Sequence, residues 1–237
     1  MAHVLIVLTS HTALGNTGKA TGFYFDEMAA PYWALIDAGH DVSIASIAGG
    51  AGEHDPGSVN TDASKRPKAV TRFLESSEAM AKLSNTPAIA TVDASRYDAI
   101  FLPGGHGTMY DFPQNEALAA AASAIWQANG VVGAVCHGPA GLIGATRADG
   151  KPIVDGLRVN AFTDAEEAAV NLTDEMPFLL ETRLRQQGAL FEKVDNFQPH
   201  AVRDGRLITG QNPASAPLVA DHLVAALADT AATQTAE

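Results

Sequence analysis

One cysteine, together with the histidine that follows it, has the residue types and spacing best suited to chemistry in this sequence. Cys136 lies in the segment Val131-Val-Gly-Ala-Val-Cys-His-Gly-Pro139, where an apolar strand meets a turn of small residues that opens a helix. The arrangement resembles a nucleophile elbow, which lifts a side chain out of a sheet toward solvent. The positive end of a helix dipole favours a thiolate and lowers the pKa of a thiol placed there. We therefore expect Cys136 to be exposed and reactive.

The alternative for Cys136 is an inert thiol in the core, since free cysteines are among the most buried residue types. Gly138 and Pro139 argue against it, because a central strand seldom continues through such a pair. A single cysteine also cannot form an internal disulfide or a multi-thiolate zinc site within one chain. Reactivity is therefore the role that the neighbouring residues favour.

The elements that position Cys136 are predicted from apolar runs, which indicate strands, and from apolar residues at helical spacing. The predicted strands cover residues 3–8, 42–47, 97–102, 131–135 and 157–162, with a tight turn between two further strands at 203–206. The predicted helices cover residues 27–38, 70–83, 115–129, 138–146, 164–170, 177–187 and 214–228. Alternation of this kind is typical of an α/β protein with a parallel sheet.

Composition places the chain among folded globular proteins, with 46% hydrophobic and 18% charged residues. The formal net charge of -12 repels phosphate backbones and anionic membranes, so neither nucleic acid nor a membrane is an expected partner. The apolar run at the N-terminus lacks a basic start and is too short for a signal core or a membrane span. We expect a cytoplasmic location.

Two motifs make the sequence resemble a known family. The stretch Ala134-Val-Cys-His-Gly-Pro-Ala140, preceded by Phe101-Leu-Pro-Gly-Gly-His-Gly107, looks like the ThiJ/PfpI superfamily of class I glutamine amidotransferase-like proteins. Further segments are similar to its heat-shock-chaperone-like subgroup, known as glutathione-independent glyoxalase III. These segments are Thr21-Gly-Phe-Tyr-Phe-Asp-Glu27, Ala161-Phe-Thr-Asp-Ala-Glu-Glu167 and Asp204-Gly-Arg-Leu-Ile-Thr-Gly-Gln-Asn-Pro-Ala-Ser215. The resemblance extends over nearly the whole chain.

The resemblance agrees with a flavodoxin-like three-layer sandwich, with a central, mostly parallel sheet and the site at the carboxyl ends of its strands. Insertions at residues 48–95 and 171–200 are expected to form a small cap. We expect a single domain over residues 1–229 and a frayed C-terminal tail over residues 230–237. The resemblance also implies a homodimer.

By the same resemblance, Cys136 is the nucleophile, His137 is its triad histidine and Glu167 is the acid that orients the histidine. A thiol beside an imidazole can form an ion pair, and a carboxylate fixes the tautomer of the imidazole. Glu166 is the alternative for the acid, and Asp164 is the next candidate. All three acids can also be explained as the first turn of a helix, where negative charge complements the dipole.

Three residues outside the triad complete the implied site. Glu27 matches a glutamate that approaches the cysteine sulfur, where burial would raise its pKa; the alternative is a surface acid on a helix. Gly104 and Gly105 match an oxyanion-binding turn, whose amides act together with that of His137; the alternative is an ordinary glycine-rich turn.

No cofactor is expected. The remaining histidines form no convincing metal-ligand pattern, and we expect them to be surface or supporting residues: His3, His11, His40, His54, His106, His200 and His222.

The function implied is conversion of methylglyoxal, or a similar small 2-oxoaldehyde, to D-lactate without glutathione or metal. Cys136 would form a hemithioacetal, and Glu27 or His137 would move a proton between adjacent carbons. Glutamine amidotransfer or peptide hydrolysis is a second possibility, but the late His-x-Glu motif of amidotransferases is missing here. A third is a holding chaperone or a cysteine redox sensor, since a low-pKa exposed thiol oxidises readily. Protein deglycation is also claimed for the family.

Overall fold

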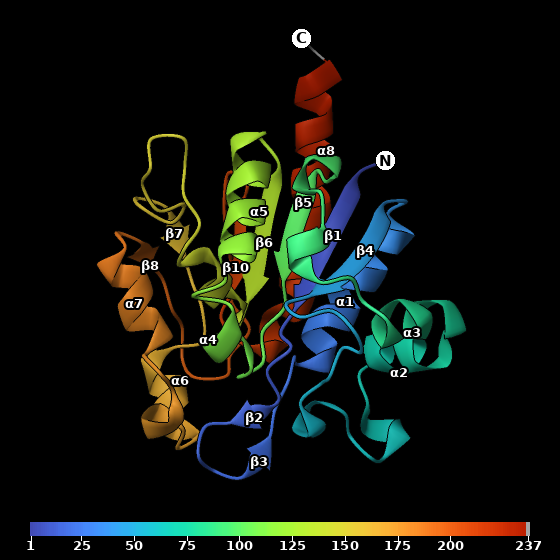
Figure 1. Cartoon of the computed structure of the whole chain (residues 1–237), viewed down its shortest axis with the longest axis vertical. Coiled ribbons are helices and arrows are strands. Elements are labelled where there is room, and N and C mark those ends of the chain that lie inside the picture. The colour runs from blue at the N-terminus through green and yellow to red at the C-terminus, as the bar shows by residue number, and fades with distance from the viewer. Residues whose placement is uncertain (236–237) are drawn as a thin grey trace.

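The computed structural model of the protein describes residues 1–235 and is built around a six-stranded sheet (Figure 1). In spatial order the strands are β4 (Asp41–Ser46), β1 (His3–Leu8), β5 (Ala99–Leu102), β6 (Val131–Val135), β10 (Leu207–Gly210) and β9 (Ala201–Asp204). All neighbouring strands are parallel except β9, which pairs with β10 in the antiparallel direction. Two small sheets pair β2 (Ala13–Leu14) with β3 (Lys19–Ala20) and β7 (Arg158–Val159) with β8 (Leu190–Phe191).

Helices cover both faces of this sheet and make the fold a three-layer sandwich (Figure 1). One face carries α1 (Phe25–Asp37) and α8 (Ala216–Thr235), and the other carries α5 (Glu116–Gln127). The remaining helices lie around the edges: α2 (Lys68–Glu75), α3 (Ser77–Ser84), α4 (Thr108–Asp111), α6 (Asp164–Ala169) and α7 (Leu180–Gln186). The flavodoxin-like α/β class predicted from the sequence is confirmed.

The central strands are nearly continuous apolar runs because both of their faces are buried. In β1, Val4 and Ile6 belong to the core on the α1 and α8 side, whereas Leu5 and Val7 belong to the core on the α5 side. A strand whose side chains enter both cores is therefore favoured by apolar residues along its whole length. Among residues 1–235, no helix has the length and apolar character needed to cross a bilayer.

Four predicted elements differ from the structure. The helix expected over residues 70–83 is divided into α2 and α3, because the Ser76 side chain accepts a hydrogen bond from the Ala79 amide and caps a new helix. The strand expected over residues 157–162 is reduced to β7, outside the main sheet. The helix expected over residues 138–146 is a short 3-10 segment, η5 (Gly138–Leu142).

The fourth difference concerns the C-terminal tail that we expected to be frayed over residues 230–237. The helix α8 continues to Thr235, and residues 236–237 lie outside the described part of the chain. The frayed segment is therefore not present over residues 230–235. The single-domain organisation expected over residues 1–229 stays a prediction.

Candidate active site

Cys136 lies directly after β6, at the carboxyl edge of the sheet, in a backbone conformation that few residues adopt. Its φ of 59° lies in the left-handed region, where a non-glycine residue is strained and is held only by surrounding contacts. The Cys136 amide donates to the Gly210 carbonyl and the Phe162 amide donates to the Cys136 carbonyl, each over 2.8 Å. Gly138 is required in the same turn, because a Cβ there would overlap the carbonyl oxygen of Leu102.

The thiol of Cys136 is buried, so the exposed thiol expected from the sequence is wrong. The residue is 4% exposed. Burial raises the pKa of the thiol well above its ordinary value, and the Glu27 carboxylate raises it further. The amides of His137 and Gly105 act in the opposite direction but do not reverse the shift. The lowering expected from a helix dipole is also wrong, because burial raises the pKa and η5 has only five residues.

Glu27, in the first turn of α1, approaches Cys136 from the next layer and is 0% exposed. Its Oε2 accepts a hydrogen bond of 2.8 Å from the Gly104 amide, while Oε1 has no hydrogen-bond partner among the described residues. Burial raises the pKa of Glu27 to about 8, although the Cys136 thiol and the Gly104 amide reduce the rise. Glu27 is therefore mostly protonated at neutral pH, and the free Oε1 is the oxygen that can carry the proton.

The contact between Cys136 and Glu27 predicts a pH dependence for alkylation of the thiol. Two coupled acids lose their protons in steps that belong to the pair, and the first step is expected near pH 8, where Glu27 titrates. The thiolate is the nucleophile, and the pKa of the thiol lies well above its ordinary value. Alkylation by iodoacetamide should therefore be slow at neutral pH and still slow near pH 8, and it should accelerate at higher pH.

Mass spectrometry measures this rate cleanly, since the chain contains a single cysteine. In Glu27→Gln, alkylation at pH 8 should be faster than in the wild type, because the carboxylate that raises the pKa of the thiol is gone. A rate that stays constant between about pH 6 and about pH 9 would indicate a preformed thiolate and contradict the prediction.

His137 connects the thiol to a second buried carboxylate. Its Nδ1 lies 3.4 Å from the Cys136 sulfur, and its Nε2 lies 2.7 Å from Oε2 of Glu167. Burial and the neighbouring His106 lower the pKa of His137. Burial opposes ionisation of Glu167, but hydrogen bonds from His106 and His137 lower its pKa to about 2. A neutral His137 thus donates from Nε2 to an ionised Glu167 and presents the Nδ1 lone pair to the thiol.

Glu166 and Asp164, the alternatives to Glu167, have other partners. Glu166 forms a capping box with Thr163 at the start of α6, and its second oxygen accepts three further hydrogen bonds. Asp164 accepts a hydrogen bond from the Thr182 hydroxyl. The pattern of a threonine followed three residues later by a glutamate is a sequence signal for this cap. Once Glu166 is assigned to the cap, Glu167 is the residue left to reach His137.

The glycine turn after β5 differs in part from the expected oxyanion-binding turn. The amide of Gly104 donates to Glu27, so the expectation that it faces a developing oxyanion is wrong. The amides of Gly105 and His137 both interact with the Cys136 sulfur and remain the candidates for that role. Gly104 is needed for close approach, since a Cβ there would lie 2.6 Å from the His137 amide nitrogen and 2.8 Å from Oε2 of Glu27.

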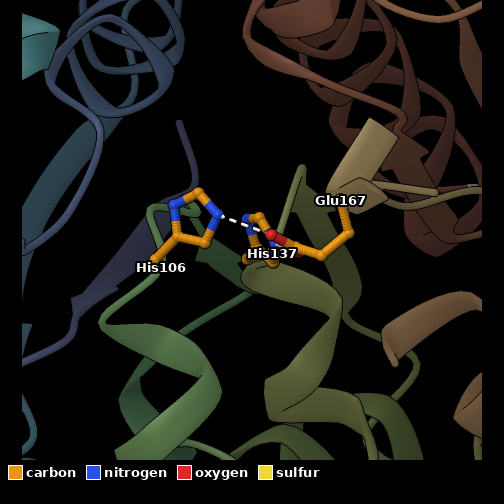
Figure 2. A group of neighbouring side chains, drawn as sticks. All are labelled: His106, His137 and Glu167. Carbon is orange, nitrogen blue, oxygen red and sulfur yellow. Dashed lines mark hydrogen bonds and ion pairs between the residues drawn. The ribbon is translucent and has the colours of Figure 1, made fainter. Parts of the chain in front are cut away.

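His106 belongs to the site, although the sequence interpretation placed it among the surface or supporting histidines. Its Nε2 lies 3.0 Å from Oε1 of Glu167, and its ring centroid lies 4.3 Å from that of His137. Figure 2 shows the two imidazoles and the carboxylate converging on one another. The sequence signal was its position in the Gly-Gly-His-Gly turn, which follows a strand ending at the same edge of the sheet as Cys136.

A cavity of about 350 Å³ opens beside these groups. Its polar wall includes Cys136, His106 and His137, and its apolar wall includes Tyr24 and Phe162. Both segments expected to form a cap reach this cavity, the first through Asp55 and Gly57 and the second through Leu172 and Phe197. Burial is the main cause that raises the pKa of Tyr24 to about 12, so its hydroxyl stays protonated. The sequence placed Tyr24 in the segment from Thr21 to Glu27 but gave no signal that its side chain lines the cavity.

A larger groove of about 590 Å³ lies beside Trp33 and Arg72. It contains neither the cysteine nor the paired histidines and carboxylates described above. The smaller cavity is therefore the candidate site.

Comparisons with known proteins agree with the fold. The DJ-1/PfpI family model matches residues 20–226. Glyoxalase 3 of Candida albicans is 31% identical over 236 residues, with 95% of this chain and 98% of that protein covered. Glutathione-independent glyoxalase HSP31 of Saccharomyces cerevisiae is 31% identical over 233 residues, with 94% and 97% covered. The crystal structure of glyoxalase III from Candida albicans matches with a TM-score of 0.87 and 30% identity, over 95% of this chain and 97% of that one.

Proposed function

The chain belongs to the DJ-1/PfpI family, and we propose that it is a glutathione-independent glyoxalase that converts methylglyoxal, or a similar small 2-oxoaldehyde, to D-lactate. Relatives at about 30% identity over nearly the full chain carry that activity in their names. One observation carries the proposal: the buried thiol of Cys136 lies between a carboxyl group that titrates near neutral pH and a histidine held by an ionised carboxylate. This set places a nucleophile between two proton carriers, beside a cavity that Cys136 and His137 line.

In the first step, the Cys136 sulfur attacks the aldehyde carbon of methylglyoxal. Nδ1 of His137 takes the thiol proton and passes it to the aldehyde oxygen, so a neutral hemithioacetal forms. Glu167 supports the positive charge that His137 carries in between. The amides of Gly105 and His137 are the donors proposed to stabilise the developing negative oxygen.

In the second step, the Glu27 carboxylate removes the hydrogen from the former aldehyde carbon as a proton. The electron pair forms an enediolate, and Glu27 returns the proton to the adjacent carbon, which yields a lactyl thioester of Cys136. A pKa of about 8 is suited to this exchange, because a base is most effective when its pKa lies near the working pH. Water then hydrolyses the thioester and releases D-lactate and the thiol.

The overall reaction adds one water to methylglyoxal, oxidises the aldehyde carbon and reduces the ketone carbon by the same amount. The test is production of D-lactate from methylglyoxal by the purified chain, without glutathione and with a stereospecific lactate dehydrogenase as the readout. Absence of D-lactate, with methylglyoxal also unconsumed, would overturn the proposal. Consumption without D-lactate would point instead to simple trapping by protein side chains.

Substitution of two adjacent glutamates separates orientation of the histidine from folding. Glu167→Gln should lower kcat on the order of 10²-fold, because the carboxylate no longer supports the charge on His137. Glu166→Gln, one residue earlier, should keep most of the activity. It should instead lower the thermal unfolding temperature, since its amide group would face donors that now bind a carboxylate.

Steady-state kinetics and thermal unfolding of both variants measure the difference. Equal loss of activity in the two variants, or an unchanged kcat in Glu167→Gln, would contradict the roles proposed.

The homodimer and the cytoplasmic location expected from the sequence stay predictions. Light scattering after gel filtration tests the former, and fractionation of the source cells tests the latter.

A further inference from the structure

The cluster of His106, His137 and Glu167 has the composition of a metal site as well as that of a hydrogen-bonded triad (Figure 2). One ligand atom from each residue lies within 4.8 Å of the others. The geometry points to a binding site for a divalent transition-metal ion that prefers imidazole, with Zn²⁺ as its best fit, held by Nε2 of both histidines and by the Glu167 carboxylate. Occupation of this site would block the thiol chemistry proposed above.

Two distances between donor atoms are somewhat shorter than those that zinc requires. In a tetrahedral site with bonds of about 2.0 to 2.2 Å, neighbouring ligand atoms lie about 3.3 to 3.6 Å apart. In the protein, Nε2 of His106 lies 3.0 Å from Oε1 of Glu167, and Nε2 of His137 lies 2.7 Å from Oε2. The ion would enter between these atoms if the two contacts opened by about 0.3 to 0.9 Å.

The orientation of the ligand atoms suits a metal ion. Metal ligands must carry a free lone pair. Nε2 of His106 and Nε2 of His137 each face an oxygen of the Glu167 carboxylate. One rearrangement is needed at each histidine, where the hydrogen that Nε2 donates to Glu167 must move to Nδ1. No net proton is lost from either imidazole in this step.

The site also has an entry path and an open coordination position. His106 keeps 18% of its side chain exposed and lines the cavity of about 350 Å³ together with His137. Three protein ligands leave a fourth position for water or a carbonyl oxygen. Cys136 contacts the opposite nitrogen of His137, Nδ1, so its sulfur lies outside this ligand set.

Metal binding and thiol activation exclude each other at His137. When the ion holds Nε2, the proton on Nδ1 faces Cys136, and that nitrogen can no longer accept the thiol proton. The ion also takes the Glu167 carboxylate that supports the imidazolium. We therefore expect Zn²⁺ to be an inhibitor; this consequence rests on the proposed function, whereas the binding does not.

The binding is tested with Zn²⁺ alone, by titration in competition with a chromophoric chelator. The wild type should bind one equivalent, and His106→Asn should bind about 100-fold more weakly or worse, since loss of a supporting group alone costs about 10- to 100-fold. His222→Asn, on α8 and outside the cluster, is the matched control and should bind like the wild type. Mg²⁺ should not compete, because it prefers oxygen ligands.

Two further measurements keep the proposal falsifiable if His106→Asn folds poorly. Glu167→Gln removes the carboxylate ligand with little change of shape and should also weaken binding. In thermal unfolding, Zn²⁺ should raise the transition temperature of the wild type and His222→Asn but not of the two cluster variants. Absence of stoichiometric binding to the wild type, or equal affinity in all variants, overturns the proposal. If D-lactate formation fails while Zn²⁺ binds as expected, the proposed function falls and the metal site stands.

Discussion

Replacement of Cys136 by serine is expected to reduce kcat/KM for D-lactate formation from methylglyoxal by at least about 10³-fold, because a hydroxyl is a far weaker nucleophile than a thiol beside a histidine. The cavity and the positions of His137 and Glu27 should change little, since the two side chains differ by one atom. The measurement is the steady-state rate of lactate formation, with thermal unfolding to confirm that the variant is folded.

Alkylation provides the same test without a substitution. The chain has a single cysteine, so the fraction of carboxamidomethylated Cys136 and the fraction of lost activity should rise together when the wild type is treated with iodoacetamide. Protein that is fully alkylated yet fully active would exclude a covalent role for this thiol. Such a result, together with an active Cys136→Ser, would remove the hemithioacetal from the mechanism.

The structure also bears on the alternative in which Cys136 is a redox sensor. That alternative depended on an exposed thiol with a low pKa. Cys136 is instead 4% exposed, and burial together with the Glu27 carboxylate raises its pKa. A thiol in this state reacts slowly until a base removes its proton, which favours turnover of a substrate that brings its carbonyl to the sulfur.

Local sequence signals were sufficient to predict most of the sheet and the position of Cys136 on it. The apolar run at residues 131–135 and the small residues after it specify β6 and the turn, because both depend on neighbours a few positions away. The environment of the thiol depends on residues far apart in the chain. Glu27 is more than a hundred positions before the cysteine, so its burial against the sulfur and its raised pKa were expected only from the family resemblance and not from any local pattern.

His106 illustrates the same limit. It contacts Glu167 across 61 positions in the chain, and only the order of the strands in the sheet brings the two together. The two glutamates of α6 differ for a local reason, since the capping box with Thr163 assigns Glu166 to the helix terminus. Contacts within a helix cap can thus be predicted from the local sequence. Contacts between residues that meet only at the edge of the sheet can be predicted only when the order of the strands is known.

Replacement of Glu27 by glutamine is expected to lower activity and to raise stability at alkaline pH, two effects of opposite sign from one change. Glutamine matches the protonated carboxyl in shape but cannot accept the substrate proton, so kcat should fall by about 10²- to 10⁴-fold. The folded chain holds the Glu27 proton up to about pH 8, whereas the ordinary value is 4.5. Between these two values the unfolded chain has released a proton that the folded chain keeps.

Stability of the wild type therefore falls as the pH rises through this window, because the unfolded state binds fewer protons. Glu27→Gln lacks that loss, and its free energy of unfolding relative to the wild type should increase between about pH 4.5 and about pH 8 by a few kcal/mol, at about 1.4 kcal/mol per pKa unit. Urea unfolding at several pH values measures the increase. The exposed Glu116→Gln serves as the control and should show no such trend. A Glu27→Gln variant that retains full activity would exclude Glu27 as the base. A difference in the free energy of unfolding that does not change with pH would mean that the Glu27 carboxyl is ionised in the folded protein as it is in the unfolded chain.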